Sequence, residues 1–208
     1  MIPVKVLSVK YLANGDGKLC RALGAPEGYP ALGLLTTDCD DATYIALDAA
    51  TKAADVEVAY SHSFYAGAAN ATTPHAGEVI GILAGRTPGA VRSGMEAALN
   101  ALEHLGFSQT QGVPYLAHTV ASVGSFLAKE ANIPLGAALA YLIAPPLESM
   151  YAMDSALKAA DVKLCKLYTP PSETNFGGGL LTGTQSACDA ACAAFAAAVE
   201  EAAAKPLE

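Results

Sequence analysis

Two polar stretches of the sequence contain residue types that could bind a small cation. TTDCDDATY places Asp38, Asp40 and Asp41 between a predicted strand and a predicted helix, and Glu78 begins a further predicted strand. Carboxylates would pair with an ammonium group, an aromatic face would add cation–π attraction, and Thr or Asn would bond a hydroxyl. The second stretch, YTPPSETNFGGG, offers carboxylate, hydroxyl, amide and aromatic groups in Glu173, Thr174, Asn175 and Phe176. The alternative to a cation site is that the aspartates cap the helix and the other polar residues form turns.

Other chemistry has less support in the sequence. The four histidines form no metal-binding spacing such as H-E-x-x-H, and no G-x-S-x-G nucleophile motif occurs. Cys188 and Cys192 lie four residues apart and could supply two metal ligands, but small buried hydrophobic residues fit them better. NFGGGLLTG lacks the GK[ST] of a phosphate-binding loop. The sequence therefore predicts no catalytic residue, no metal and no cofactor.

The composition limits the partners. A net charge of −8 and a pI near 4.9 argue against nucleic acid, and no apolar run is long enough for a membrane span. Five cysteines without a regular framework suggest reduced thiols in a cytosol. Only 15% of the residues are charged, which indicates that much of the surface is buried between halves or between subunits.

A repeated phrase predicts two copies of one structural unit. LDAATKAADVEV (Leu47 to Val58) and MDSALKAADVKL (Met153 to Leu164) match at seven of twelve positions. Asp48 corresponds to Asp154, 106 residues later. Each phrase is typical of an amphipathic helix that leads into a strand. Repeats of this kind decide the whole fold.

The flanking segments extend the repeat to both halves of the chain. Each half is predicted to contain a strand, a short helix, a strand, a long helix, two strands and a final helix. We therefore expect an α+β protein of two tandem domains, residues 1–108 and 109–208. The polar composition of FSQTQGVP, from Phe107 to Pro114, predicts a linker between them.

Several longer strings carry a resemblance to a known family. DCDDATYIALDAATKAADVEV, FYAGAANA, AGEVIGILAG, AYLIAPPLE and the SETNF region closely resemble the ethanolamine-utilisation shell proteins of bacterial microcompartments. The resemblance implies two circularly permuted shell domains, each a small, mostly antiparallel sheet flanked by helices. It further implies a homotrimeric, pseudo-hexagonal tile that packs with other shell proteins, and a gated central pore with smaller pores in each subunit. The implied location is the shell of a compartment in the cytoplasm, and the implied role is passage of metabolites or cofactors without catalysis.

The resemblance also implies a binding site for ethanolamine. The positions that would contact ethanolamine are Asp40, Asp41, Glu78, Phe107, Thr174, Asn175 and Phe176.

Two segments are candidate mobile pore loops, because they are rich in Gly, Ser, Thr and Pro: Ser61 to Gly77 and Tyr168 to Gly179.

Three alternatives stay open at this point. A tile of another microcompartment would bind a different small alcohol or amine. A regulatory module would bind a small metabolite between its two α+β units and never form sheets. An enzyme would use Asp40, Asp41 and Glu78 as acid, base or metal ligands.

Overall fold

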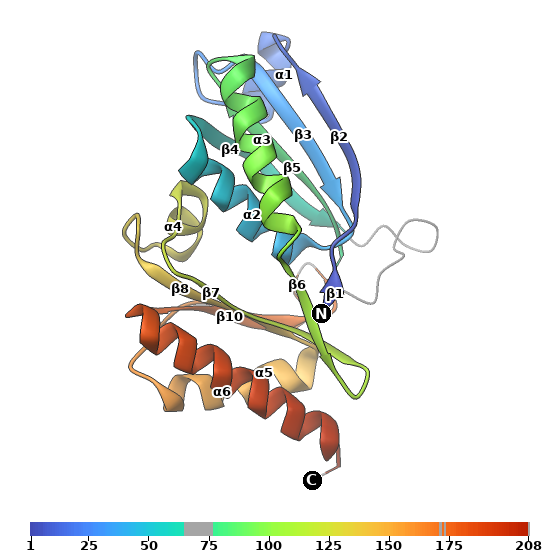
Figure 1. Ribbon diagram of the computed structural model, residues 1–208, viewed down its shortest axis with the longest axis vertical. Helices are drawn as coiled ribbons and strands as arrows, with labels where there is room; N and C mark the ends of the chain where they lie inside the picture. The colour runs from blue at the N-terminus through green and yellow to red at the C-terminus, as the bar shows by residue number, and fades with distance from the viewer. Residues whose placement is uncertain (65–76, 171, 173, 208) are drawn as a thin grey trace. The chain divides into compact units, whose positions relative to one another are not determined.

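The computed structural model describes residues 1–64, 77–170, 172 and 174–207 (Figure 1). The chain divides into two compact units. The N-terminal unit contains Pro3–Leu105 together with Gly124–Leu127, and the C-terminal unit contains Met1–Ile2, Gly106–Val123 and Ala128–Glu208. The domain boundary predicted after residue 108 stays a prediction.

A four-stranded antiparallel sheet, in the order β2-β3-β5-β4, forms the centre of the N-terminal unit. The two long helices, α2 and α3, contact each other and the sheet. The short helix α1 and the loop that follows it pack against buried hydrophobic side chains that include Leu32 and Ile82. The elements are β2 (Val6–Leu12), α1 (Gly17–Ala22), β3 (Ala31–Thr37), α2 (Asp40–Ala53), β4 (Val56–Phe64), β5 (Glu78–Gly85) and α3 (Pro88–Leu102).

Two strand glycines allow the long helices to lie close to this sheet. A Cβ at Gly81 would come 2.6 Å from the Leu47 side chain of α2, and one at Gly33 would come 2.8 Å from Val91 of α3. Neither strand position could therefore carry a larger residue without displacing the helix that covers it. The start of α3 is fixed by Thr87, whose hydroxyl accepts a hydrogen bond from the amide of Ala90.

The C-terminal unit is built on a six-stranded sheet in the order β1-β6-β7-β8-β10-β9. Strand β8 is buried along its whole length, and α5 and α6 pack together against the sheet. No helix of the described chain is long and apolar enough to cross a membrane. The elements are β1 (Ile2–Pro3), β6 (Gly106–Thr110), β7 (Val113–Val120), α4 (Ser125–Ala131), β8 (Ala138–Ala144), α5 (Pro146–Ala159), β9 (Lys163–Tyr168), β10 (Gly177–Gly183) and α6 (Gln185–Ala204).

The cysteines of α6 belong to the core of this unit. Cys188 and Cys192 are buried in one cluster with Phe195 and Leu142, which confirms the prediction of small buried hydrophobic residues. Burial raises the pKa of the Cys192 thiol to about 11, and the hydroxyl of Thr119 donates to its sulfur over 3.4 Å.

The predicted order of elements is confirmed in both halves, as is the α+β fold class with two tandem repeats. The predicted linker is wrong. Phe107 to Pro114 contains strand β6, a two-residue turn and the start of β7, with Ser108 paired to Tyr115. Gln111 and Gly112 both have positive φ, at 47° and 85°, as a tight two-residue hairpin turn requires.

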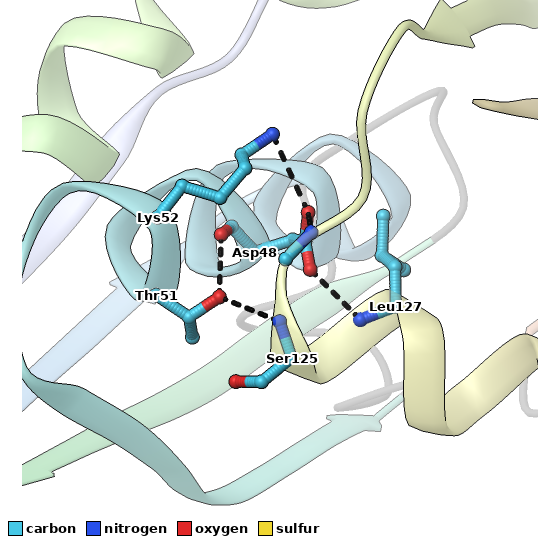
Figure 2. Close-up of polar contacts among 6 residues, drawn as sticks. Asp48, Thr51, Lys52, Ser125 and Leu127 are labelled. Carbon is cyan, nitrogen blue, oxygen red and sulfur yellow. Dashed lines mark hydrogen bonds and ion pairs between the residues drawn. The ribbon is translucent and has the colours of Figure 1, made fainter. Parts of the chain in front are cut away.

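One buried carboxylate fixes a distant segment of the chain onto α2 (Figure 2). Asp48 has no exposed surface, and its two side-chain oxygens accept hydrogen bonds from the amides of Gly124, over 2.7 Å, and Leu127, over 2.8 Å. Thr51 accepts a further bond from the amide of Ser125 over 3.1 Å. We call this set of contacts the Asp48 cap, since it satisfies amides at the start of α4 that have no partner within that helix.

The Asp48 cap takes the place of an ordinary N-cap. A Cβ at Gly124 would lie 2.2 Å from the Thr51 hydroxyl oxygen and 2.6 Å from the Asp48 carbonyl oxygen, so only glycine fits there. The side chain that usually caps a helix is therefore absent at this position, and α2 supplies the carboxylate instead. Lys52 lies 3.5 Å from the same carboxylate and balances its charge.

Replacing Asp48 by alanine should lower the free energy of unfolding by about 2–4 kcal/mol, because two buried amides lose their acceptor. The matched control is Asp154→Ala, at the equivalent position of the repeat, where the carboxylate is exposed and pairs with Lys158 of the same helix. That variant should stay within about 0.5 kcal/mol of the parent chain. Urea denaturation followed by circular dichroism, at one protein concentration, measures both. Equal losses would show that the cap contributes nothing specific.

Candidate ligand-binding site

The acidic side chains of the predicted site gather around the first turn of α2. Asp40 and Asp41 are its first two residues and are 4% and 7% exposed. The amide of Asp40 donates to the carbonyl of Gly77 over 3.1 Å, which brings the start of β5 to the same place. Glu78 follows as the first residue of β5 and is half-buried.

Hydrogen bonds hold the Asp40 carboxylate in place. It accepts one from the amide of Asp41 over 2.9 Å and another from the hydroxyl of Ser63, which is itself buried near the end of β4. The helix dipole adds a favourable field, because negative charge is stabilised at the start of a helix. The predicted alternative, helix capping by the aspartates, is wrong: the N-cap residue is Cys39, no side-chain hydrogen bond caps the helix, and Asp40 accepts a bond from the next amide, that of Asp41.

Burial raises the pKa of the Asp40 carboxyl from its ordinary value of 3.8 to about 6, although the bonds from the Asp41 amide and Ser63 lower it. Burial, followed by the charge of Asp41, also raises the pKa of the adjacent Cys39 thiol. Within the described residues, no lysine, arginine or histidine forms an ion pair with Asp40. A cation reaching this carboxylate would lower its pKa, because an opposite charge favours the ionised form and offsets the effect of burial.

The aromatic and hydroxyl members of the site lie in the C-terminal unit. Phe107 and Phe176 stack with ring centroids 6.0 Å apart, tilted by 44°. Phe107 has no exposed surface, so it supports the half-buried ring of Phe176 from behind. Phe107 of β6 and Phe176 of the SETNF region, two of the implied ligand contacts, therefore lie side by side.

Thr174 stabilises the turn that precedes Phe176. Its hydroxyl accepts from the amide of Phe176 over 3.4 Å and bonds the Ser172 hydroxyl at 3.3 Å. The amide of Ser172 closes the turn onto the carbonyl of Phe176 over 3.2 Å. Thr174 is 6% exposed, whereas Asn175 is exposed. Glu173, and most of the predicted loop from Ser61 to Gly77, lie outside the described residues.

The structure thus forms two clusters from the seven predicted positions. The acidic cluster contains Asp40, Asp41 and Glu78 and belongs to the N-terminal unit, while the aromatic cluster contains Phe107, Thr174, Asn175 and Phe176 and belongs to the C-terminal unit. Sequence reasoning missed Ser63 and the Gly77 carbonyl. Neither has a signal in the sequence, since Ser63 is positioned by the pairing of β4 with β5 and Gly77 stands directly before β5.

The class of protein follows from the fold and from a family model. The model described as the BMC domain matches residues 31–114, from β3 through α3 into the start of β7. The match leaves out β2 and α1, which precede the domain in the chain, as expected for a permuted order of elements. Two tandem, permuted copies of this domain place the chain among the bacterial microcompartment shell proteins.

Full-length relatives define the particular family. The bacterial microcompartment shell protein EutL of Clostridium perfringens is 54% identical over 211 residues, which cover 100% of this chain and 97% of the relative. The crystal structure of EutL from Leptotrichia buccalis superposes with a TM-score of 0.93 at 55% identity, covering 100% of this chain and 97% of that one. The trimeric shell protein PduB shares the fold, with a TM-score of 0.81 at 20% identity over 96% and 89% of the two chains. The chain belongs to the EutL family.

Membership of the EutL family establishes the broad role of this chain. The chain is a structural protein of the bacterial microcompartment shell and not an enzyme, and shell proteins of this kind assemble with one another. The alternative of an enzyme that uses Asp40, Asp41 and Glu78 as acid, base or metal ligands therefore does not apply.

The raised pKa of Asp40 gives a prediction for stability against pH. A carboxyl whose pKa is higher in the folded than in the unfolded chain binds its proton more tightly when folded, so the free energy of unfolding falls as the pH rises from about 4 to about 6. Asp40→Asn removes this fall. Relative to the parent chain, the variant should gain about 2–3 kcal/mol between pH 4 and pH 7.

Urea denaturation at several pH values measures this difference. Asp189→Asn, on the exposed side of α6, controls for the loss of one negative charge. A constant difference between Asp40→Asn and the parent chain across the pH range would contradict the raised pKa.

Proposed function

We propose that three copies of this chain form a pseudo-hexagonal tile with a gated central pore for metabolites or cofactors, and that ethanolamine binds at the smaller pores. The single observation that carries the ligand assignment is Asp40: a buried, hydrogen-bonded carboxylate that no described cation neutralises, at the start of α2. Membership of the EutL family supports the tile, and a shell protein of the same fold is described as trimeric.

The two clusters together supply the groups that ethanolamine needs. The carboxylates of Asp40, Asp41 and Glu78 would pair with its ammonium group. The Phe176 ring, supported by Phe107, would offer a cation–π face, and Thr174 or Asn175 would bond the hydroxyl. Ethanolamine at neutral pH is an ammonium with a hydroxyl, so each end of the ligand has a chemically matched partner.

Ligand binding would bias the pore by population shift. A ligand that binds the closed tile more tightly than the open one stabilises the closed form in proportion to the difference in affinity. Ethanolamine bound through both clusters would favour whichever arrangement brings them together. This mechanism requires no covalent chemistry.

The native mass in solution tests the tile. Sedimentation equilibrium at micromolar concentration should give a trimer, and electron microscopy should show sheets or tubes as the protein is concentrated. A strict monomer would remove the central pore and leave a ligand-binding module as the surviving function.

Calorimetric titration tests the ligand. Ethanolamine should bind at pH 7.5 and lose affinity about tenfold for each pH unit below the Asp40 pKa of about 6, because the ammonium must then displace a proton. Asp40→Asn should weaken binding at least tenfold at neutral pH.

Two uncharged alcohols separate ethanolamine from the ligands of another microcompartment. Ethanol and 1,2-propanediol lack the ammonium group and should bind neither the parent chain nor the Asp40→Asn variant. Tighter binding of 1,2-propanediol than of ethanolamine would assign the tile to a different substrate. Unchanged ethanolamine affinity in Asp40→Asn would remove Asp40 from the site.

A further inference from the structure

A serine near the end of β4 donates a hydrogen bond to the buried carboxylate at the start of α2. Ser63 is 3% exposed, and its hydroxyl bonds the side chain of Asp40, which is 4% exposed. The pairing of β4 with β5 places Ser63 opposite Val79. Gly77, two residues before Val79, accepts the amide of Asp40 over 3.1 Å. Two neighbouring segments therefore hold Asp40 at both its carboxylate and its backbone amide.

The second repeat shows that the shared fold does not require this contact. At the offset of the repeated phrase, Asp40 corresponds to Pro146 and Ser63 corresponds to Thr169. The bulges of β4 and β9 lie at the same offset and support this alignment. Helix α5 begins with Pro146 and Leu147 in place of the two aspartates, and Thr169 is exposed. The bond between serine and carboxylate is therefore specific to the first repeat, which contains the acidic cluster.

The Ser63 bond opposes the effect of burial on Asp40. Burial favours the protonated form of a carboxyl, whereas a hydrogen bond donated to the carboxylate favours the ionised form. The donors to Asp40 are the amides of Asp41 and of Asp40 itself, the Ser63 hydroxyl and the Asp41 carboxyl. Ser63 is the one among them that offers a neutral side chain. Substitution at Ser63 thus removes a donor without changing the charge of the cluster.

The other charged or titratable groups of this region do not take over that role. His62 lies on the opposite face of β4 from Ser63, and its ring centroid is 6.3 Å from that of Tyr60. Lys5 reaches the region through its backbone, because its amide donates to Asp38 over 2.7 Å. The remaining groups are acids and a thiol that precede α2, begin it or begin β5: Asp38, Cys39, Asp41 and Glu78. None of these four adds positive charge beside Asp40.

We propose that Ser63 is a positioning residue of the ethanolamine site: its hydroxyl keeps Asp40 as the ionised, fixed carboxylate that an ammonium ligand requires at neutral pH. This role rests on the proposed function, since it takes the ligand group to be an ammonium. Ser63 acts through Asp40 and needs no contact with the ligand. A protonated Asp40 would present a hydroxyl to the ammonium and lose the charge that attracts it.

The pH dependence of ethanolamine binding tests this role. Ser63→Ala should raise the pKa of Asp40 from about 6 to about 7 or above, because the carboxylate loses a charge-assisted hydrogen bond. Relative to the parent chain, the affinity in calorimetric titration should fall at least about fivefold at pH 6 and stay within about twofold at pH 8. Ser63→Cys, of similar size but with a weak S–H donor, should give the same profile.

Thr43→Val is the matched control. Thr43 is another buried hydroxyl at the start of α2, and it donates to the carbonyl of Cys39 over 2.7 Å. Its equivalent in the second repeat, Ser149, donates to the carbonyl of Pro146, so this contact belongs to the shared fold. Thr43→Val should lower the stability but leave the pH profile of binding parallel to that of the parent chain. A Ser63→Ala profile that also stays parallel would indicate a structural role and overturn the proposal.

Urea denaturation without ligand separates the role of Ser63 from the ligand assignment. In the parent chain, the fall in stability caused by Asp40 ends near pH 6, and Ser63→Ala should extend it to about pH 7, because the folded-state pKa is higher. The extension should vanish in Ser63→Ala/Asp40→Asn, since the carboxyl through which Ser63 acts is gone. An equal extension in the single and double variants would overturn the proposal.

Failure of this role differs from failure of the ligand site. A parent chain that binds ethanolamine, with parallel profiles for Ser63→Ala and Thr43→Val, would leave the site intact and overturn the role of Ser63. A parent chain that does not bind ethanolamine would overturn the ligand assignment and, with it, the role of Ser63 in binding. The denaturation series would then still measure whether Ser63 sets the charge of Asp40.

Discussion

The Asp48 carboxylate is the interaction on which the described arrangement of the first repeat depends. It is fully buried, yet each of its oxygens has an amide partner and Lys52 balances its charge, so the cost of desolvating it is offset. Because Gly124 leaves no room for a side chain, the contact is geometrically specific: α2 and the 124–127 segment fit in one register. A carboxylate that satisfies the start of another helix joins parts of the chain more than seventy residues apart.

Much of the fold could be predicted from the sequence, because the repeat sets the order of elements twice. The hairpin of β6 and β7 could not, since its residues are polar and its turn depends on positive φ at Gln111 and Gly112. The different surroundings of Asp48 and Asp154 could not be predicted from the sequence either. The two residues stand in nearly identical phrases, and only the tertiary structure decides that one is buried and the other exposed.

The candidate site was predictable to a similar extent. The sequence locates an acidic pair at the start of a helix and an aromatic turn in the second half, and the structure places Asp40 and Asp41 together and Phe107 beside Phe176. It could not indicate that Asp40 is buried, or that Ser63 bonds its carboxylate and Gly77 its amide, because these contacts depend on the tertiary structure around α2. The residue types therefore predicted which chemical groups the candidate site offers, and the tertiary structure determines how strongly the Asp40 carboxyl is buried. The proposed ligand site depends on this buried carboxylate.

The pairing of β1 with β6 has a consequence for synthesis of the chain. Ile2 and Pro3 are synthesised about a hundred residues before their partner strand, which begins at Gly106, whose Cα lies so close to the Ile2 carbonyl that a methyl group would not fit. Strand β1 must therefore wait, unpaired, until this partner strand has emerged from the ribosome. A fusion tag attached before β1 would therefore be joined to a strand of the sheet rather than to a free end.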